Sequence, residues 1–392
     1  MSPYAWYATA AGTWFLAFGL QSVIVSTIIA MRLHGDSGAM SLAQMAQQLP
    51  GFGLILLGGA VADRVDRRAL LVGLYLGAAA LVIALGLGAE LEWLSLPVVI
   101  GFVLAMGTLS AFVMPSRDAL LSDVVAGNLM RAITVLTLIQ FAMQAVGSGL
   151  GVAGRYLGLL PLIALQAGVL LIGVPALLRL PRSAPSGAPR ALRFGELLDG
   201  VREVARSPVL GPISLLSLAL GMFFIGPFQV VFPLLVRDFY HGDVADLSLL
   251  YTAFPLGTIT GSALILARGG VRRKGAAQLL SLGGGAICIG SLGFGLPFWA
   301  ALVVTVLFGV GGAFFMNAGR TLFQEHANPA SRGRVLSVYT LTIMGASGVI
   351  GAPLAGWLHA ELGPLGACSA AAGLMLVTIL TVTVTTDIRK LV

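Results

Sequence analysis

The residues 58–68, GGAVADRVDRR, constrain this chain more than any other stretch. They place two aspartates and three arginines between two long apolar runs, residues 41–62 and 69–88. A helix needs about 20 apolar residues to cross a bilayer, and both runs meet that length. Short loops rich in arginine between two crossings stay on the cytoplasmic side. The stretch therefore predicts a cytoplasmic loop between two membrane-spanning helices.

Composition excludes a water-soluble fold. The chain has 392 residues, of which 57% are hydrophobic and 10% charged, whereas soluble domains carry about 25% charged residues. The net charge of +7 does not indicate nucleic-acid binding, because the basic residues follow membrane topology. Cys288 and Cys368 lie in apolar runs, so we expect buried packing residues and neither a disulfide nor a metal site.

Apolar runs of spanning length predict an all-α integral membrane protein with twelve transmembrane helices. Placing both termini in the cytoplasm leaves only Arg32, Arg155 and Arg237 among the basic residues of the outer loops, as the positive-inside rule requires. The expected spans are 4–31, 40–62, 69–88, 96–115, 132–153, 157–178, 209–235, 247–267, 276–294, 298–319, 335–357 and 364–386.

The chain carries an internal repeat of about 200 residues. Residues 261–275 are a blurred copy of the first loop, and Arg117 and Arg131 recur as Arg320 and Arg334, 203 positions later. This predicts two six-helix pseudo-repeats, residues 1–178 and 209–392, a known transporter architecture. The connecting residues 179–208 begin as a polar, proline-rich linker. They continue as an amphipathic helix that we expect on the cytoplasmic membrane surface.

These motifs resemble those of a known family. The pattern from Gly59 to Arg68 resembles the signature loop between helices two and three of the major facilitator superfamily, with Asp66 where glycine is usual. That departure resembles a bacterial branch of enterobactin-exporter-like efflux permeases. Residues 115–121 and 324–335 are similar to the same branch. The family antiporter motif on helix five is only partly matched, because Ser148 stands where proline is expected.

The resemblance implies a transporter that works by alternating access, with helices one, four, seven and ten around a central cavity. It also implies a cytoplasmic gate in which Asp63 sits near the start of span eleven, and Arg64 or Arg67 reaches an acid at the end of span four. The alternative for the arginines is that they only fix topology. The gate residues are Asp63, Arg64, Arg67, Asp118, Asp123 and Arg334.

Amides and aromatic residues on the cavity-forming helices are the candidate substrate contacts. Trp14, Phe18 and Gln21 recur at i, i+4 and i+7, so they share one face of span one. A buried amide must be hydrogen-bonded, and a wet cavity or an interhelical hydrogen bond would satisfy it equally. The full candidate set is Trp14, Phe18, Gln21, Gln140, Gln144, Phe228, Gln229, Asn317 and Tyr339.

Ionisable residues are essentially absent from the middle of the expected spans, which predicts a neutral or mixed apolar-polar cavity. If protons drive transport, the available carboxylates are Asp36 and Asp238 on the outer side, and Asp118 and Asp123 on the inner side. Each of these is also explained as an ordinary solvated loop acid.

The sequence thus favours a secondary transporter that exports an amphiphilic small molecule, such as a siderophore, drug or metabolite. An importer or facilitator and a lipid or lysolipid flippase of the same fold are the alternatives. A membrane-embedded enzyme is less favoured, because no nucleophile–base pair, cofactor motif, metal cluster or phosphate-binding loop occurs in the sequence. We expect a monomer in the bacterial inner membrane whose partners are its substrate and membrane lipids.

Overall fold

The computed structural model describes residues 2–125, 129–182, 194–327, 335, 338–339, 342–343 and 345–391. All regular structure in these ranges is helical. The α-helices are α1 (Pro3–Thr27), α2 (Ser37–Arg64), α3 (Arg67–Glu90), α4 (Leu96–Val124), α5 (Leu129–Leu150), α6 (Gly154–Leu157), α7 (Leu159–Leu178), α8 (Phe194–Arg206), α9 (Leu210–Leu220), α10 (Gly226–Leu234), α11 (Val244–Ala267), α12 (Lys274–Leu292), α13 (Phe298–His326) and α15 (Ala352–Thr385). The shorter helices are the π-helices η1 (Ile28–Arg32), η3 (Gly221–Ile225), η4 (Leu235–Phe239) and η5 (Ala346–Gly351), and the 3₁₀ turns η2 (Gly151–Ala153) and η6 (Ile388–Lys390).

Among the described residues, ten helical stretches are long and apolar enough to cross a membrane. The last of them, Ala346–Thr385, has 40 residues, which is about 60 Å of helix and twice the thickness of a hydrocarbon core. It is interrupted at Gly363, whose φ is 69°, so it forms two crossings. With α2 counted as a further crossing, the predicted all-α membrane architecture is confirmed.

Two helices run further than the sequence predicted. α4 ends at Val124 and α13 at His326, whereas residues 115 and 319 were the expected limits. A helix satisfies its own backbone hydrogen bonds, so leaving the apolar layer does not by itself end it. Arg117, Asp118 and Asp123 therefore lie on α4 rather than in a loop.

The loop between α2 and α3 is very short because Asp66 caps α3. Its carboxylate accepts a 3.0 Å hydrogen bond from the Arg68 backbone N–H, and its backbone is extended. Asp is among the best N-cap residues, whereas glycine has no side chain to bond this N–H. The unusual aspartate of the signature loop therefore has a structural explanation at this position.

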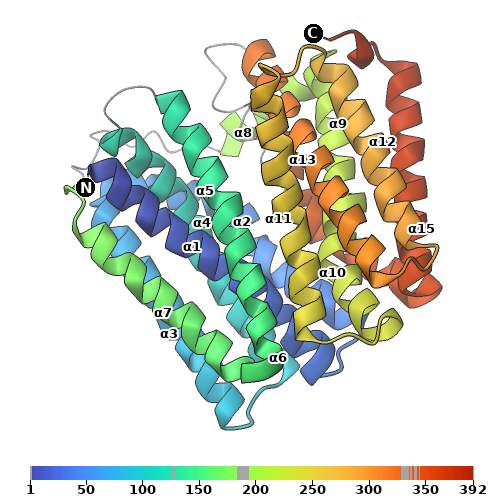
Figure 1. Ribbon diagram of the computed structural model, residues 1–392. Helices are drawn as coiled ribbons and strands as arrows, with labels where there is room; N and C mark the ends of the chain where they lie inside the picture. The colour runs from blue at the N-terminus through green and yellow to red at the C-terminus, as the bar shows by residue number, and fades with distance from the viewer. Residues whose placement is uncertain are drawn as a thin grey trace. The chain divides into compact units, whose positions relative to one another are not determined.

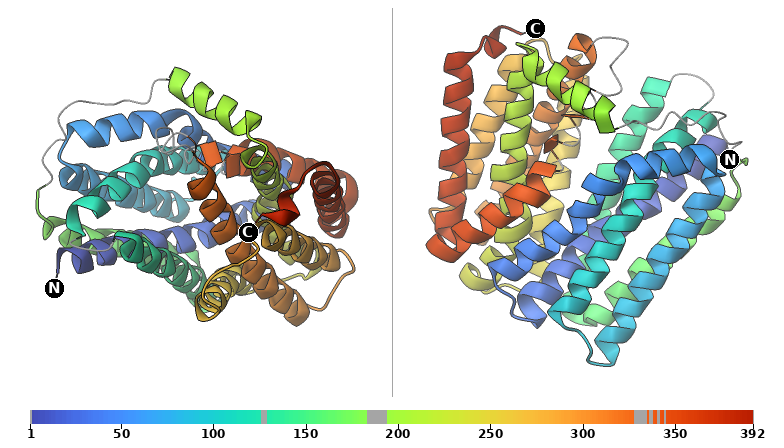
Figure 2. Two further views of the ribbon diagram at one scale, coloured as in Figure 1. Left: turned by 90° about the horizontal axis from the view of Figure 1, so that it is seen from above. Right: turned by 180° about the vertical axis from the view of Figure 1, so that it is seen from behind.

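The chain divides into two compact units. Unit 1 comprises residues 1–35, 46–191 and 242–252, and unit 2 comprises residues 36–45, 192–241 and 253–392. In unit 1, α1 packs on α5 and α7, while α3 packs on α4 and α7 (Figure 1). In unit 2, α12 packs on α13 and α15, and α10 packs on α15 (Figure 2).

Glycines allow close helix approaches at nearly equivalent places in both repeats. A Cβ on Gly107 of α4 would collide with the backbone carbonyl of Gln47 on α2. A Cβ on Gly309 of α13 would collide with the carbonyl of Phe254 on α11. The two glycines stand 202 positions apart. Close approach through small residues is the usual packing mode inside membranes, and the repeat seen in the sequence is thus also a repeat of packing.

Each unit also holds a short segment of the other repeat. In unit 1, the first three turns of α11 lie against the end of the fifth crossing. Ser148 is 3.1 Å from the Thr252 hydroxyl, and Arg155 bonds both Asp243 and Asp246 at 2.6–2.9 Å. We call this contact the α5–α11 seam.

In unit 2, the first turns of α2 lie against α15. Ser37 and Ser41 each donate a 2.8 Å hydrogen bond to a backbone carbonyl of α15, those of Gly356 and Ala352 respectively. We call this contact the α2–α15 seam. Together the two seams join the sequence repeats through hydrogen bonds and one ion cluster.

Candidate functional site

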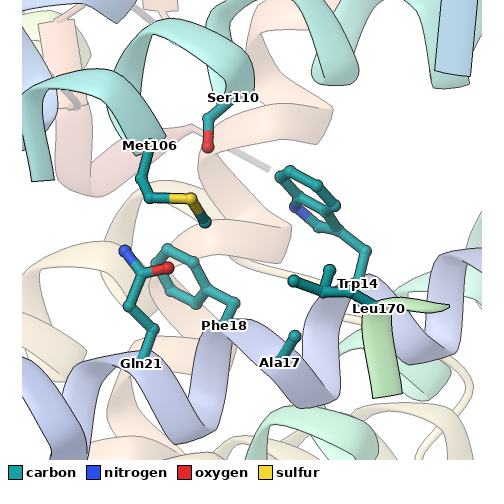
Figure 3. A pocket seen from close by; sticks show the side chains of 7 residues that line it. All are labelled: Trp14, Ala17, Phe18, Gln21, Met106, Ser110 and Leu170. Carbon is teal, nitrogen blue, oxygen red and sulfur yellow. The ribbon is translucent and has the colours of Figure 1, made fainter. Parts of the chain in front are cut away.

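Unit 1 contains a small pocket between α1, α4 and α7 (Figure 3). Its cavity volume is about 10 Å³, which is room for about one water molecule. Its lining is apolar apart from one amide, one hydroxyl group and one indole N–H. The lining residues are Trp14, Ala17, Phe18 and Gln21 of α1, Met106 and Ser110 of α4, and Leu170 of α7. Such a lining suits a molecule with a large apolar part and few polar groups.

Helical periodicity brings the α1 residues to the pocket. Trp14, Ala17, Phe18 and Gln21 follow the i, i+3, i+4, i+7 spacing of one helix face. The small Ala17 leaves room between the larger side chains (Figure 3). Phe18 is 37% exposed, so its ring offers free contact area. The structure thus brings three predicted substrate contacts of α1 together, while their role in binding stays a prediction.

Trp14 is held in place by Tyr75 of α3. The two ring centroids are 5.1 Å apart, and the Tyr75 hydroxyl donates a 2.8 Å hydrogen bond to the Ala10 carbonyl. Tyr75 is therefore anchored to the same helix that carries Trp14. This arrangement fixes the indole as a rigid wall of the pocket, which lowers the entropy lost when a ligand packs on it.

Gln21 combines the two roles that the sequence left open. Its Oε1 accepts a long, 3.4 Å hydrogen bond from Gln166 of α7, so it makes an interhelical contact. Its side chain also lines the pocket, although the residue is only 4% exposed. The Gln166 Oε1 is buried without a hydrogen-bond partner among the described residues. The Gln166 Oε1 atom is therefore still available to accept a hydrogen bond.

Gln140 and Gln144 of α5 are not among the pocket-lining residues. Both are half-buried. The backbone carbonyl of Gln144 accepts a hydrogen bond from the Ser148 hydroxyl, and it also lies against Gly19 of α1. α5 thus contributes close packing to unit 1.

The four remaining substrate candidates lie in unit 2, and two of them are aromatic. Phe228 of α10 packs in tilted geometry against Phe232 and Phe254, at centroid distances of 5.0 and 5.3 Å. Tyr339 is buried against Phe323 at 4.7 Å. Both rings are therefore engaged in aromatic packing.

The other two are amides. The Asn317 Nδ2 donates to the Ala313 carbonyl of its own helix at 2.8 Å, while its side chain is exposed. The Gln229 Oε1 is a buried atom that lacks a hydrogen-bond partner within the described ranges. A buried orphan acceptor is costly, so of the two candidate amides in unit 2, Gln229 is better suited than Asn317 to accept a hydrogen bond from a ligand.

The gate residues show one of the expected ion pairs. Arg67 Nη1 lies 2.8 Å from Asp123 Oδ2 and ties the start of α3 to the end of α4. Asp118 instead lies 3.7 Å from Arg117, and Arg64 is exposed at the end of α2. The Asp63 side chain and the whole of Arg334 lie outside the described residues. A latch role for any of these residues stays a prediction.

The two outer carboxylates occupy structural positions in unit 2. Asp36 Oδ1 accepts a 2.8 Å hydrogen bond from the Ala39 N–H, at the first turn of α2. Asp238 is bonded by Arg237 and lies 3.8 Å from His359 Nε2. Within the part of the chain that the structure describes, no group of three His, Cys, Asp or Glu side chains could hold a metal ion.

Sequence reasoning missed four pocket residues, Ala17, Met106, Ser110 and Leu170, and the burial of Arg117. Met106 and Ser110 are four positions apart on α4, but a methionine and a serine in an apolar run carry no distinctive signal. The sequence presents Arg117 only as a marker of the repeat and as part of the family-like residues 115–121. In the structure, Arg117 is only 5% exposed.

Known proteins resemble this chain along most of its length. The sequence model of the Major Facilitator Superfamily matches residues 8–352. The enterobactin exporter EntS of Shigella boydii serotype 4 (strain Sb227) is 29% identical, over 96% of this chain and 90% of that protein. EntS of Escherichia coli O139:H28 (strain E24377A / ETEC) is also 29% identical, with the same coverage.

Solved structures share the fold at low sequence identity. The nucleoside transporter NupG superposes with a TM-score of 0.77 at 12% identity, covering 98% of this chain and 99% of that one. The human organic anion transporter MFSD10 superposes with a TM-score of 0.70 at 16% identity, covering 97% and 98%.

Proposed function

Because this chain belongs to the Major Facilitator Superfamily, we propose that it exports an amphiphilic small molecule by alternating access. That the chain is a multi-pass membrane transporter rather than an enzyme follows from the family itself. The direction of transport, the cargo class and the mechanism are our proposal. We further propose that it acts as a monomer in a bacterial inner membrane, with both termini in the cytoplasm.

The observation that carries the proposal is the pocket of unit 1. A rigid indole, an exposed phenyl ring and a thioether offer apolar contact, while Gln21 and Ser110 offer hydrogen bonds. This combination suits a cargo that is largely apolar with a few polar groups. The likeness to exporters over 96% of the chain supports the outward direction.

The seams support alternating access. Arg155, Asp243 and Asp246 form a cluster of short ion-pair bonds at the α5–α11 seam. Neutral hydroxyl–carbonyl bonds form the α2–α15 seam. Contacts of this kind bias an equilibrium between two packings, and they break as a set when the repeats rock apart. In the proposed orientation both seams lie on the outer face.

The proposal is tested in proteoliposomes and in cells that lack the protein. Fluorescent amphiphiles that differ in charge are loaded into the deletion strain with and without the gene. Export predicts faster loss of at least one dye when the protein is present. Faster uptake would identify an importer or facilitator, and dye or lipid movement only between leaflets would identify a flippase.

Energy coupling needs its own measurement. Proteoliposomes are given a pH gradient of either sign, and the rate of dye movement is compared with that of liposomes without a gradient. A rate that depends on the sign of the gradient supports proton antiport. Equal rates in all three conditions rule proton drive out.

A further inference from the structure

Arg117 is a buried cation that the fold leaves poorly bonded. The residue lies on α4 and is 5% exposed. Among the described residues, its Nε and Nη1 atoms are buried with no hydrogen-bond partner, and Nη2 reaches only the Met114 sulfur, at 3.3 Å. An arginine presents five N–H donors in a fixed fork. A buried guanidinium with unused donors is costly unless some other group completes it.

The surroundings stabilise the charge only in part. The guanidinium carbon lies 4.5 Å from the centroid of the Phe15 ring, in cation–π geometry. The Tyr7 hydroxyl bonds the Arg117 backbone carbonyl and not the guanidinium. The Asp118 carboxylate lies 3.7 Å from Nη2, beyond hydrogen-bond range, and its side chain is 67% exposed. None of these groups occupies the free Nε and Nη1 donors.

The second repeat shows that the family fold does not require this burial. Arg320 stands 203 positions later on α13 and is exposed. Both arginines therefore satisfy the same topological rule, but only Arg117 is buried beneath an aromatic ring. The burial is a property of the first repeat, which is also the repeat that holds the pocket.

Arg117 is connected to that pocket through two of the three helices that line it, α4 and α1. Ser110 lines the pocket from α4 and stands seven positions before Arg117, on the same helix face. Phe15, which covers the guanidinium, directly follows Trp14, which lines the pocket. To reach the guanidinium from the pocket, a ligand would need the Phe15 ring that covers it to turn aside.

We propose that Arg117 is the anion-recognition point of the pocket, and that the cargo is an amphiphile with one carboxylate-type group. This inference rests on the proposed transport function. The apolar part of the cargo packs on Trp14 and Phe18, and its anionic oxygens accept hydrogen bonds from the two free donors of Arg117. Charge-assisted bonds to a guanidinium are stronger than neutral ones and are selective for planar oxyanions.

The test uses naphthalene-2-carboxylate and its neutral isostere naphthalene-2-carboxamide as probes of the purified full-length protein. Binding is measured by thermal shift and by titration for the wild type, Arg117→Met, Arg117→Lys and the matched control Arg320→Met. We expect the wild type and Arg320→Met to bind the carboxylate at least about tenfold more tightly than the carboxamide, as charge-assisted bonds would do. Arg117→Met should lose this preference yet keep its affinity for the carboxamide, and Arg117→Lys should be intermediate.

Equal binding of the two probes by the wild type, binding of neither, or an unchanged preference in Arg117→Met overturns the anion site. If Arg117→Met does not fold, Arg117→Lys and the wild-type preference decide the question. The dye assay separates this inference from the proposed function. If the protein exports dyes but does not prefer the carboxylate probe, only the anion-site proposal is refuted. If the protein shows an Arg117-dependent preference for the carboxylate but moves no dye, only the export proposal is refuted.

Discussion

Arg67 at the start of α3 donates a 2.8 Å hydrogen bond to Asp123 at the end of α4. The second repeat builds the same link, because Lys274 at the start of α12 lies 2.9 Å from Glu325 at the end of α13. Each pair lies within one repeat. The repeated geometry favours a role in stiffening each bundle, in addition to any part that Arg67 and Asp123 play in a gate.

The two ion pairs should differ in strength. The Arg67 side chain is 9% exposed, so replacing Asp123 by alanine leaves a buried charge without this partner and should cost about 1–3 kcal/mol. The same replacement of the half-exposed Glu325 should cost at most about 1 kcal/mol. Thermal denaturation of Arg67→Ala, Asp123→Ala and the double variant gives the coupling energy. Additive single effects would show that the pair contributes nothing.

Asp63 can be tested separately from the cap of α3. Asp63→Asn should reduce export several-fold while the purified protein keeps its thermal midpoint, because a gate acts on the conformational equilibrium and not on folding. Asp66→Asn is the matched control, since asparagine caps a helix as well as aspartate does. Normal export by Asp63→Asn would remove this residue from the gate.

The α5–α11 seam should weaken in acid. The hydrogen bond from Arg155 holds the pKa of Asp243 below its ordinary value near 3.8. A lowered pKa means that the stabilisation is fully present above that value and is lost as the pH falls through the lowered one. The thermal midpoint of the wild type should therefore exceed that of Arg155→Gln at pH 7, and the gap should close below about pH 4. A gap independent of pH would contradict the assignment.

Glycine packing in unit 1 gives a stability prediction. A Cβ on Gly147 of α5 would collide with the Leu16 carbonyl of α1, whereas a Cβ on Gly168 of α7 would meet nothing within 4 Å. Gly147→Ala should lower the free energy of unfolding by about 1–3 kcal/mol, because the helices must move apart. Gly168→Ala should change it by less than about 1 kcal/mol. Equal thermal midpoints for the two variants would refute the close contact.

Gln21 and Gln166 separate ligand contact from helix packing. Both variants Gln21→Leu and Gln166→Leu remove the same interhelical hydrogen bond, but only Gln21 lines the pocket. We expect Gln21→Leu to weaken cargo binding by about fivefold to twentyfold, as the loss of one hydrogen bond of about 1–1.5 kcal/mol would do. Gln166→Leu should leave binding near the wild-type value. Similar losses in both variants would assign the effect to packing.

Part of the candidate site followed from periodicity. Trp14, Phe18 and Gln21 meet at one pocket because residues at i, i+4 and i+7 share a helix face whatever the partner helix is. Gln140 and Gln144 obey the same rule on α5, yet they do not line this pocket. Helical periodicity predicts which residues share one side of a helix. It does not predict which neighbouring helix that side contacts.

The sequence by itself determined the all-helical membrane class, because apolar length and loop charge act locally and need no tertiary partner. It also determined the family, through the resemblance of short motifs such as residues 59–68. Only the tertiary structure decided that α4 brings Met106 and Ser110 to the pocket. It also decided that the aromatic ring of Phe15 covers Arg117, while the equivalent Arg320 stays exposed. These outcomes depend on how each helix is rotated about its axis, and that rotation is set by close packing between segments far apart in the chain.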